Sequence, residues 1–546
     1  MKNRFYFLVV LSFIFSIQVS AQLFKRTAEI TEPSNKERGF GGVIAGVDFD
    51  KDGKTEIYAC NTNMVDGPYE LIPRLYKFEW NKTTSKWDSV WSATAPLSKQ
   101  NTWPAFAWGD VDKDGKPEIY WAPVNYSPYP ELPRILVYEY SGTGDDMGVS
   151  DGLGGFLPNA STPIVPGNGI NLRPIKFVIA DVDNDGKDEI IFADRASYMK
   201  IGVLSVDKIP DLGGGTEKWT VEFAGTDDPG IKALSSVYDI AVVNNYIYAF
   251  DGGGNVAGVY YANGKWNSAK AQKGLAGGKG SFKGSAVVDI NKDGKKEILV
   301  AEWLDNTKGQ GAKVWLLQQV ADSLTSTEIA DLESLGAVRL NGAAAGDLDS
   351  DGKLDFVTAA RYDANNTVKV PVFRVEYQSG DIASKGSYTS AVIDSAYWTK
   401  NGDMDVVAIG NVDGDKDDEV LYTQGYSRGN PTDERMPLVI LDRQFTPVSV
   451  EKLSYEVPAN FYLEQNYPNP FNPTTNIRFG LNEASIVQLK VYNLLGEEVT
   501  TLVNNELMNA GSYNIKFNAE KLSSGIYIYT LKAGNYTLSK KMQLIK

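Results

Sequence analysis

Histidine is absent from the 546 residues, and cysteine occurs once, as Cys60. Without histidine the chain cannot use Ser-His-Asp or Cys-His catalysis, an HExxH zinc site or a histidine-ligated haem. A single cysteine excludes an internal disulfide, and Cys60 is most simply a buried thiol. These absences remove several of the commonest hydrolase and metalloenzyme chemistries.

An excess of basic residues is also lacking, because 54 Lys and Arg stand against 69 Asp and Glu and the formal charge is −15. Nucleic acid is therefore disfavoured as a partner, since it requires clustered Lys and Arg, and cations are the expected ions. With 42% hydrophobic residues and 52 Gly, the composition indicates a folded chain rich in tight turns.

Long apolar runs are missing beyond the N-terminus, so we expect no membrane span in the mature chain. The first 21 residues carry Lys2 and Arg4, an apolar run over residues 5–17 and small residues before Gln22. This pattern predicts a cleaved secretory signal peptide over residues 1–21, and an N-terminal membrane anchor is the alternative.

An acidic nine-residue segment recurs along the chain. Its first copy, residues 48–56, reads Asp-Phe-Asp-Lys-Asp-Gly-Lys-Thr-Glu, with carboxylates at positions 1, 3, 5 and 9 and glycine at position 6. Residues 235–248 keep an alternating hairpin, with Asp239 as its first position, but lose the acidic loop. The hairpin completes a series of seven units with a period of about 60 residues. The six acidic copies begin at Asp48, Asp110, Asp181, Asp289, Asp347 and Asn411.

Each unit reads as a meander of four strands, which is the pattern of a propeller blade. The sequence therefore predicts an all-β chain, with a seven-bladed β-propeller over residues 22–457, and an open stack of β-units is the alternative. The units resemble the FG-GAP or VCBS repeats of integrin-α-type propellers. The resemblance is weaker in the Phe-Gly and Gly-Ala-Pro elements, which residues 106–109 only approximate.

Carboxylates at positions 1, 3, 5 and 9 and a backbone carbonyl at position 7 supply six or more hard oxygens, which suit Ca²⁺. The sequence predicts five or six structural Ca²⁺ ions, and an acidic turn without metal is the alternative for any single copy. The copy at Asn411 is the weakest, because Lys416 replaces its turn glycine. The predicted ligands are Asp48, Asp50, Asp52, Lys54 and Glu56; Asp110, Asp112, Asp114, Lys116 and Glu118; Asp181, Asp183, Asp185, Lys187 and Glu189; Asp289, Asn291, Asp293, Lys295 and Glu297; Asp347, Asp349, Asp351, Lys353 and Asp355; and Asn411, Asp413, Asp415, Asp417 and Glu419.

The pattern changes near residue 458. A Pro- and Asn-rich stretch over residues 466–473 precedes alternating apolar strands, and residues 458–546 predict a small antiparallel β-sandwich. The motifs Asn-Tyr-Pro-Asn-Pro-Phe-Asn-Pro, Val-Tyr-Asn-Leu-Leu-Gly and Ser-Gly-Ile-Tyr, followed by a basic C-terminus, closely resemble the C-terminal sorting domain of type IX secretion in Bacteroidota-like bacteria. The resemblance implies contact with that secretion machinery and a secreted or outer-surface location; an immunoglobulin-like spacer is the alternative.

On the propeller, the loops between second and third strands are the expected ligand-binding face, because functional residues concentrate on loops. Aromatic rings with Arg suit sugars or peptide segments. Ordinary loop packing is the alternative for each residue. The candidates are Tyr69, Trp121, Tyr126, Tyr129, Arg195, Trp303, Arg361 and Tyr362.

No catalytic residues can be assigned from the sequence, so the favoured hypothesis is a non-catalytic binding or adhesion module for a glycan or protein ligand. The alternative is a secreted calcium-dependent polysaccharide lyase or hydrolase with its site on the same face. A structural component of an outer surface layer is a third possibility.

Overall fold

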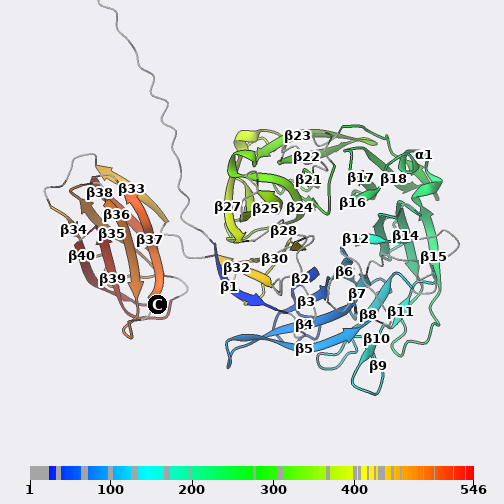
Figure 1. Ribbon diagram of the computed structural model, residues 1–546, viewed down its shortest axis with the longest axis horizontal. Helices are drawn as coiled ribbons and strands as arrows, with labels where there is room; N and C mark the ends of the chain where they lie inside the picture. The colour runs from blue at the N-terminus through cyan, green and yellow to red at the C-terminus, as the bar shows by residue number, and fades with distance from the viewer. Residues whose placement is uncertain are drawn as a thin grey trace, which may run out of the picture. The chain divides into compact units, whose positions relative to one another are not determined.

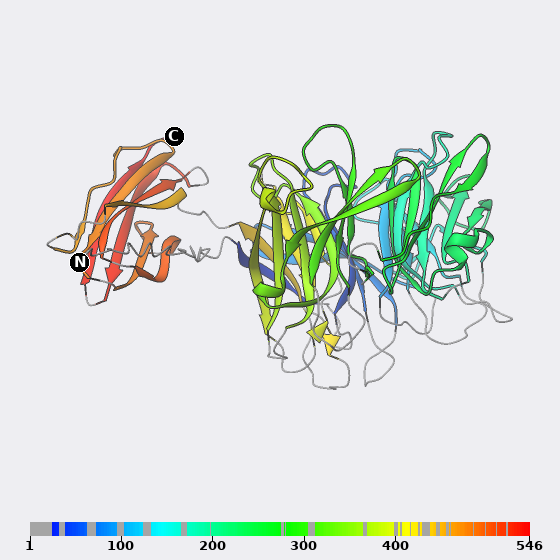
Figure 2. The same ribbon diagram turned by 90° about the horizontal axis from the view of Figure 1, so that it is seen from above.

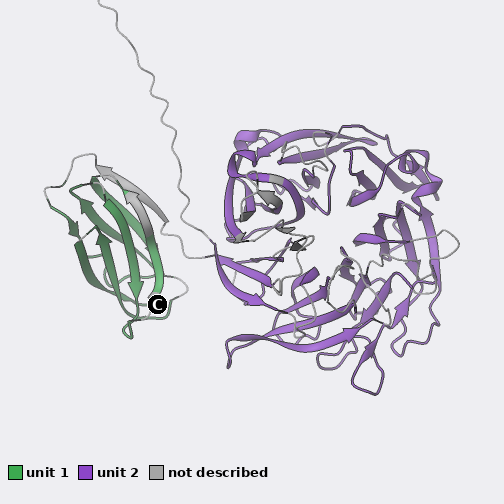
Figure 3. Cartoon of the chain, in the orientation of Figure 1, with its two compact units in different colours: residues 1–23, 444–546 green, residues 24–443 purple. Residues whose placement is uncertain are grey.

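The computed structural model consists almost entirely of antiparallel β-sheets and has two compact units, residues 24–443 and the C-terminal residues from 444 onward (Figure 3). The structure describes residues 24–31, 39–62, 72–95, 103–123, 133–164, 172–196, 198–274, 278, 280–303, 312–363, 369–397, 402–403, 407–414, 417–423, 426–427, 437–443, 448–454, 458, 460–483, 485–496, 498–508, 510–519, 522–534 and 536–546. Residues 1–21, the predicted signal peptide, lie outside these ranges.

Seven four-stranded sheets form the first unit within its described residues. Sheets 1 to 3 consist of β2 (Phe40–Val47), β3 (Glu56–Asn61), β4 (Arg74–Asn81) and β5 (Lys86–Thr94); β6 (Ala105–Gly109), β7 (Glu118–Ala122), β8 (Leu136–Glu139) and β11 (Ala160–Ser161); and β12 (Pro174–Ala180), β13 (Glu189–Asp194), β14 (Ile201–Val206) and β15 (Trp219–Ala224). A hairpin of β9 (Val149–Ser150) and β10 (Phe156–Leu157) is inserted in sheet 2.

Sheets 4 to 6 repeat the meander. They consist of β16 (Val237–Val243), β17 (Tyr246–Asp251), β18 (Val256–Ala262) and β19 (Lys265–Ser268); β20 (Ser285–Val288), β21 (Glu297–Ala301), β22 (Lys313–Val320) and β23 (Ser323–Asp331); and β24 (Ala337–Gly346), β25 (Asp355–Asp363), β26 (Lys369–Tyr377) and β27 (Tyr388–Tyr397). The few helical turns are η1 (Gly225–Asp227), α1 (Pro229–Lys232), η3 (Glu333–Leu335) and η4 (Lys385–Ser387). None of the helices among the described residues has the length and apolar character needed to cross a bilayer.

Sheet 7 joins the two ends of the first unit. Its inner strands are β29 (Val407–Gly410), β30 (Glu419–Thr423) and β32 (Leu438–Arg443), and its outermost strand is β1 (Phe24–Ile30), which pairs with β32. A separate pair is formed by β28 (Gly402–Asp403) and β31 (Tyr426–Ser427). Because β1 is supplied by the start of the unit, strand pairing fastens the ring and leaves one fewer open edge. No repeat or motif of the sequence predicts this strand.

The first strands of neighbouring sheets contact one another in the order β2, β6, β12, β16, β20, β24, β29 and back to β2. Figure 1 shows the resulting ring, and Figure 2 shows the strands running from one face of the ring to the other. Apolar residues of adjacent sheets form shared core clusters, for example Ile44 and Cys60 of sheet 1 with Leu136 of sheet 2. The predicted all-β propeller followed by an antiparallel sandwich is confirmed.

Sheet 4 differs from the others at its first hairpin. Strand β16 continues to Val243 and turns at Asn244 and Asn245, so Asp239 lies near the start of the strand and not in the loop. The prediction that Asp239 is the first residue of this loop was wrong. The pairing of β16 with β17 shows that Asn244 occupies the place where the acidic loops of the other sheets have their first residue. Asp239 is fully buried and accepts a hydrogen bond from Lys176 of sheet 3 at 2.5 Å.

The C-terminal unit is a sandwich of two antiparallel sheets whose facing side chains form one core, including Ile477, Leu489 and Tyr529. Strand β33 lies before the predicted boundary at residue 457 and pairs with β38 of this unit. The sheets consist of β33 (Val448–Ser454), β38 (Gly511–Asn518), β35 (Thr474–Leu481) and β34 (Tyr462–Leu463); and β37 (Glu498–Met508), β36 (Ser485–Tyr492), β39 (Gly525–Ala533) and β40 (Tyr536–Leu544).

Part of the Pro- and Asn-rich stretch packs within this sandwich. Asn466 is buried, donates from Nδ2 to Thr475 Oγ1 at 3.0 Å, and its backbone N–H donates to Tyr529 Oη at 2.8 Å. Phe471 is 2% exposed and belongs to the core. The motif residues therefore contribute to the packing of the unit.

Candidate metal centres and ligand face

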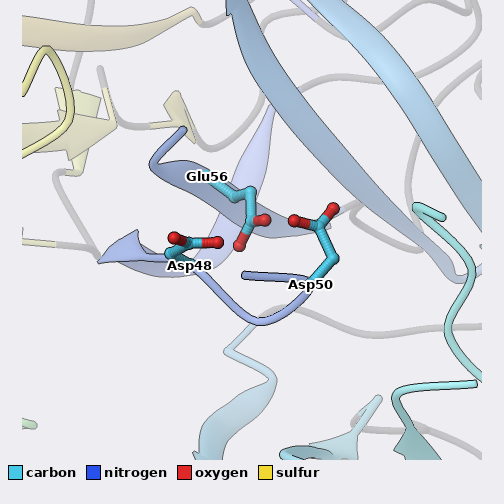
Figure 4. A group of neighbouring side chains, drawn as sticks. All are labelled: Asp48, Asp50 and Glu56. Atoms are coloured by element: carbon cyan, nitrogen blue, oxygen red, sulfur yellow. The ribbon is translucent and has the colours of Figure 1, made fainter. Parts of the chain in front are cut away.

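The acidic segments join the first and second strands of six sheets, and they lie on one face of the ring, which we call the loop face. Neighbouring loops contact one another there: Thr55 Oγ1 donates to the Val412 carbonyl at 2.9 Å, and Lys113 Nζ lies 2.5 Å from Asp188 Oδ2. In sheet 1, Figure 4 shows the carboxylates of Asp48, Asp50 and Glu56 turned toward one another.

Three backbone contacts shape the loops of sheets 1, 2, 3, 5 and 6, and the third of them is also found in sheet 7. In sheet 1, Gly53 N–H donates to Asp48 Oδ2 at 3.2 Å and Lys54 N–H donates to Asp52 Oδ1 at 2.8 Å. Phe49 is buried below the loop, and its N–H donates to Glu56 Oε2 at 2.9 Å. The first contact recurs with Gly115, Gly186, Gly294 and Gly352, the second with Lys116, Lys187, Lys295 and Lys353, and the third with Val111, Val182, Ile290, Leu348 and Val412.

The position-6 glycine is required by conformation, since Gly53 has φ 85° and the equivalent glycines lie between 85° and 92°. Position 4 is also left-handed in every copy, and five of the six residues there are not glycine. The last loop has Gly414 at this position, with φ 79°, while Asp415 and Lys416 lie outside the described residues. A left-handed non-glycine residue costs conformational energy, and this second constraint was not predicted from the sequence.

Carboxylate oxygens within 4.8 Å of one another are found in the groups Asp48, Asp50 and Glu56; Asp110, Asp112 and Glu118; and Asp181, Asp183 and Glu189. These groups could hold a metal ion. The donor set fits a hard cation, because Oε1 of the buried Glu118 and Glu189 has no hydrogen-bond partner among the described residues. The other predicted loop residues occupy equivalent positions in their hairpins, except that Asp415 is not described.

Burial at position 9 disfavours the charged carboxylate. It raises the pKa of Glu118 to about 9 and that of Glu189 to about 8, with neighbouring loop carboxylates adding to the effect. Burial also raises the pKa of Glu56 to about 7 and that of Asp355 to about 6, where Lys77 and Arg374 respectively counteract it. These loops therefore hold buried carboxyl groups that a bound cation would return to the ionised form.

This arrangement predicts an unusual pH dependence in chelator. The folded-state pKa of Glu118, about 9, lies above its ordinary 4.5, so folding takes up a proton between these values and stability falls as pH rises through the window. Relative to Glu118→Gln, the wild-type chain should lose melting temperature between about pH 5 and pH 9. Thermal melts of both chains in chelator measure the difference.

If the loop binds calcium, the difference should no longer widen with pH when calcium is present, because a bound cation would stabilise the carboxylate. A wild-type chain in chelator that gained stability over Glu118→Gln as pH rose would contradict the burial argument.

The opposite face carries a cluster of aromatic and arginine side chains, which we call the aromatic–arginine cluster. Trp103, Phe282 and Trp303 form a buried group with the partly buried Tyr238. The Arg195 guanidinium lies 4.4 Å from the Trp103 ring centroid, and that of Arg339 lies 4.7 Å from the Trp303 ring centroid. Such contacts combine a flat apolar surface with directed polar groups.

Two of the predicted ligand-binding residues, Arg195 and Trp303, belong to this cluster, although Trp303 is only 3% exposed. Trp121 was assigned to the ligand-binding face, but it is fully buried with its ring centroid 6.3 Å from that of Tyr138, so it packs the core instead. Side chains of Tyr69, Tyr126, Tyr129, Arg361 and Tyr362 lie outside the described set, although Arg361 and Tyr362 fall within β25. The other cluster members lack a local sequence signal, because four sheets supply them.

Buried acidic residues on this face hold loops in place. Asp194 accepts hydrogen bonds from the backbone N–H groups of Arg173, Ala196 and Met199 at 2.8 to 2.9 Å. Asp251 does the same in sheet 4. Their oxygens are engaged by backbone donors, which indicates structural roles.

Comparison with known families agrees with the two parts of the chain. Residues 39–121 match the FG-GAP-like repeat, and residues 465–546 match the secretion system C-terminal sorting domain. The chain thus contains an FG-GAP-like repeat and a C-terminal sorting domain of type IX secretion, and both resemblances inferred from the sequence are confirmed. The sorting domain indicates export to the cell surface and implies interaction with the type IX machinery.

No curated protein matches the sequence. Among solved structures, the N-terminal domain of Nup159 is similar over 77% of this chain and 94% of its own, with 9% identity and a TM-score of 0.37. A subtype N11 neuraminidase-like protein of A/flat-faced bat/Peru/033/2010 is similar over 77% and 93%, with 10% identity and a TM-score of 0.30.

Proposed function

We propose that this protein is a calcium-stabilised propeller that acts as a non-catalytic binding or adhesion module at the cell surface, with a glycan or protein ligand. Export by the type IX route delivers it to a place where extracellular ligands are available. The proposed calcium sites are the six acidic loops, with the position-9 carboxylate as the buried ligand of each. Hard, closely spaced oxygens and the orphaned Oε1 atoms of Glu118 and Glu189 support calcium.

One observation carries the non-catalytic part of the proposal. Strongly perturbed carboxyl groups are typical of catalytic sites. Among the described residues, the carboxyl groups whose pKa burial raises to between about 6 and about 9 all belong to an acidic loop or to the strand facing one: Glu56, Glu118, Glu139, Glu189 and Asp355. On the opposite face burial also raises the pKa of Asp194, but backbone N–H groups counteract the effect there. These raised carboxyl groups thus lie where ions would bind, which favours a structural use.

The aromatic–arginine cluster is the proposed ligand platform, because its partly buried Arg195 and Tyr238 can extend a flat surface toward a sugar ring or peptide side chain. The test incubates the full chain in calcium with a panel of bacterial, algal and plant polysaccharides and records both retention and polymer length. Retention without shortening is expected.

Arg195→Ala should weaken retention by about tenfold, as expected for one stacked cationic contact. Lys82→Ala is the matched control, because it removes the same charge from the exposed turn between β4 and β5 on the loop face and should leave retention unchanged. Polymer shortening would replace this proposal with the lyase or hydrolase alternative. Equal retention by both variants would remove the cluster from the binding site.

A further inference from the structure

A second set of carboxylates lies beside three of the acidic loops, contributed by the third strand of the sheet. Strand pairing places Glu79 opposite Glu56, Glu139 opposite Glu118, and Glu376 opposite Asp355. Glu56, Glu79, Glu118 and Glu139 are at most 6% exposed. Like charges directly opposite one another in a sheet are destabilising, and burial increases the cost, so each pair requires a nearby cation.

In sheet 1 the cation is the ammonium group of Lys77, whose side chain is 1% exposed. Lys77 Nζ lies 2.6 Å from Asp50 Oδ2, 2.8 Å from Asp145 Oδ1, 3.1 Å from Glu79 Oε1 and 3.2 Å from Glu56 Oε1. The carboxylates of Asp50, Glu79 and Asp145 are themselves spaced as a metal-binding group. The lysine thus occupies the position that an ion would take.

Sheet 6 uses an arginine in the same position. In both sheets the basic residue pairs with the residue that lies two positions after position 9 of the loop. Arg374 pairs with Val357 in sheet 6, and Lys77 pairs with Tyr58 in sheet 1. Its guanidinium contacts Asp355, lies 3.0 Å from Asp349 Oδ2 and lies 3.2 Å from Glu376 Oε2. A basic side chain therefore fills this site in two sheets of different sequence.

Sheet 2 has the same carboxylates but no such cation, because the equivalent residue is Val137, which pairs with Tyr120. Asp112, Asp114 and Glu139 offer oxygens within 4.8 Å of one another. Oε1 of Glu118 and Oε1 of Glu139 are buried without a hydrogen-bond partner among the described residues. Their counterparts in sheet 1, Oε1 of Glu56 and of Glu79, also make no hydrogen bond, but they lie 3.2 and 3.1 Å from Lys77 Nζ. The Ile209 N–H, which donates to Asp112 Oδ2 at 2.7 Å, helps to hold the cluster in place.

Lys116 does not replace the missing cation. Its Nζ contacts Asp211 and stays 3.5 Å from Asp114 Oδ2 and 3.6 Å from Glu139 Oε2. Its counterpart in sheet 1, Lys54, makes the same kind of outer contact with Asp52 and Glu79 although Lys77 is also present. In sheet 1 the two ammonium groups of Lys54 and Lys77 face six carboxylates, those of Asp48, Asp50, Asp52, Glu56, Glu79 and Asp145. In sheet 2 the single ammonium group of Lys116 faces the six carboxylates of Asp110, Asp112, Asp114, Glu118, Glu139 and Asp211.

We propose that sheet 2 binds a second Ca²⁺ ion between Asp112, Asp114 and Glu139, next to the ion of its acidic loop, in the position that Lys77 fills in sheet 1. The set consists of hard carboxylate oxygens, which suit Ca²⁺. The inference rests on the proposed calcium loops, because Asp112 is a ligand both of the loop ion and of the second ion. Sheet 2 is then a two-ion centre, whereas sheets 1 and 6 each combine one ion with a basic side chain.

The test counts bound calcium per full chain by equilibrium dialysis. Val137→Lys supplies the missing ammonium and should bind one ion fewer than the wild type. Glu139→Gln should also lose one ion, while Glu79→Gln, the matched change in sheet 1, should lose none because Lys77 occupies that site. Circular dichroism in calcium verifies that each variant is folded, and Glu139→Gln decides the matter if Val137→Lys does not fold.

Unchanged counts in folded Val137→Lys and Glu139→Gln would overturn the second site. Glu189→Gln reports on the loop proposal, because sheet 3 has Ser205, and not a glutamate, at the strand position that Glu139 occupies in sheet 2. Loss of an ion in Glu189→Gln without loss in Glu139→Gln leaves the loops standing and rejects the second site. No bound calcium in the wild type rejects both.

Discussion

Chelation of calcium should lower the temperature at which the propeller unfolds by on the order of 10 °C. A ligand that binds only the native state stabilises it by about 2.7 kcal/mol per site when its free concentration is a hundredfold above its Kd. Five or six loops of this kind would together contribute a large part of the stability of a domain of this size, because native proteins are only marginally stable. Differential scanning calorimetry of the full chain, with calcium and with chelator, measures the shift.

The control is the return of an ion to the chelated protein. Added calcium should restore the original transition, and magnesium should restore less of it, because Mg²⁺ prefers a small octahedral shell and keeps its waters. An identical propeller transition with and without chelator would show that the loops are acidic turns without a structural ion.

The second large effect is expected at Lys77. Replacing it by Met should cost about 3–5 kcal/mol in chelator, because the change leaves buried carboxylates without their cation. Lys77 Nζ lies within 3.2 Å of four carboxylate groups from two sheets, so the loss also affects the contact between those sheets. Urea denaturation in chelator, in which no ion can take the place of the ammonium, gives the difference in the free energy of unfolding.

Lys54→Met is the matched control for Lys77→Met. Lys54 contacts the same carboxylate cluster, but its side chain is 53% exposed, so its pairs should be worth less than about 1 kcal/mol. Equal losses in the two variants would show that the buried position of Lys77 has no special importance.

The architecture was largely predictable because the sequence has two periods. Apolar and polar residues alternate along the strands, and the acidic segment recurs about every 60 residues. The loop contacts follow from the same segment, since the glycine at position 6 is left-handed in the five copies that have it and the apolar residue at position 2 is buried in all six. The position of Asp239 was misjudged because an acidic residue near a turn was matched without the strand register, which only the pairing of β16 with β17 defines.

Long-range features were not predictable in this way. Strand β1 pairs with β32, which lies more than 400 residues later in the chain, and no local sequence pattern predicts such a pairing. Trp121 was judged by residue type, whereas its burial depends on the packing of sheet 2 against sheet 1. The role of Lys77 was also missed, because a lysine in an alternating strand is expected to be solvent-exposed, whereas three carboxylates of its own sheet and Asp145 of the next sheet surround it.

The central claim is that the acidic loops bind calcium, and the most direct measurement is anomalous diffraction from crystals grown in calcium. We expect a peak inside each loop of sheets 1, 2, 3, 5 and 6, among the side-chain oxygens of positions 1, 3, 5 and 9. Loops without anomalous peaks, in crystals that contain calcium at saturating concentration, would contradict it.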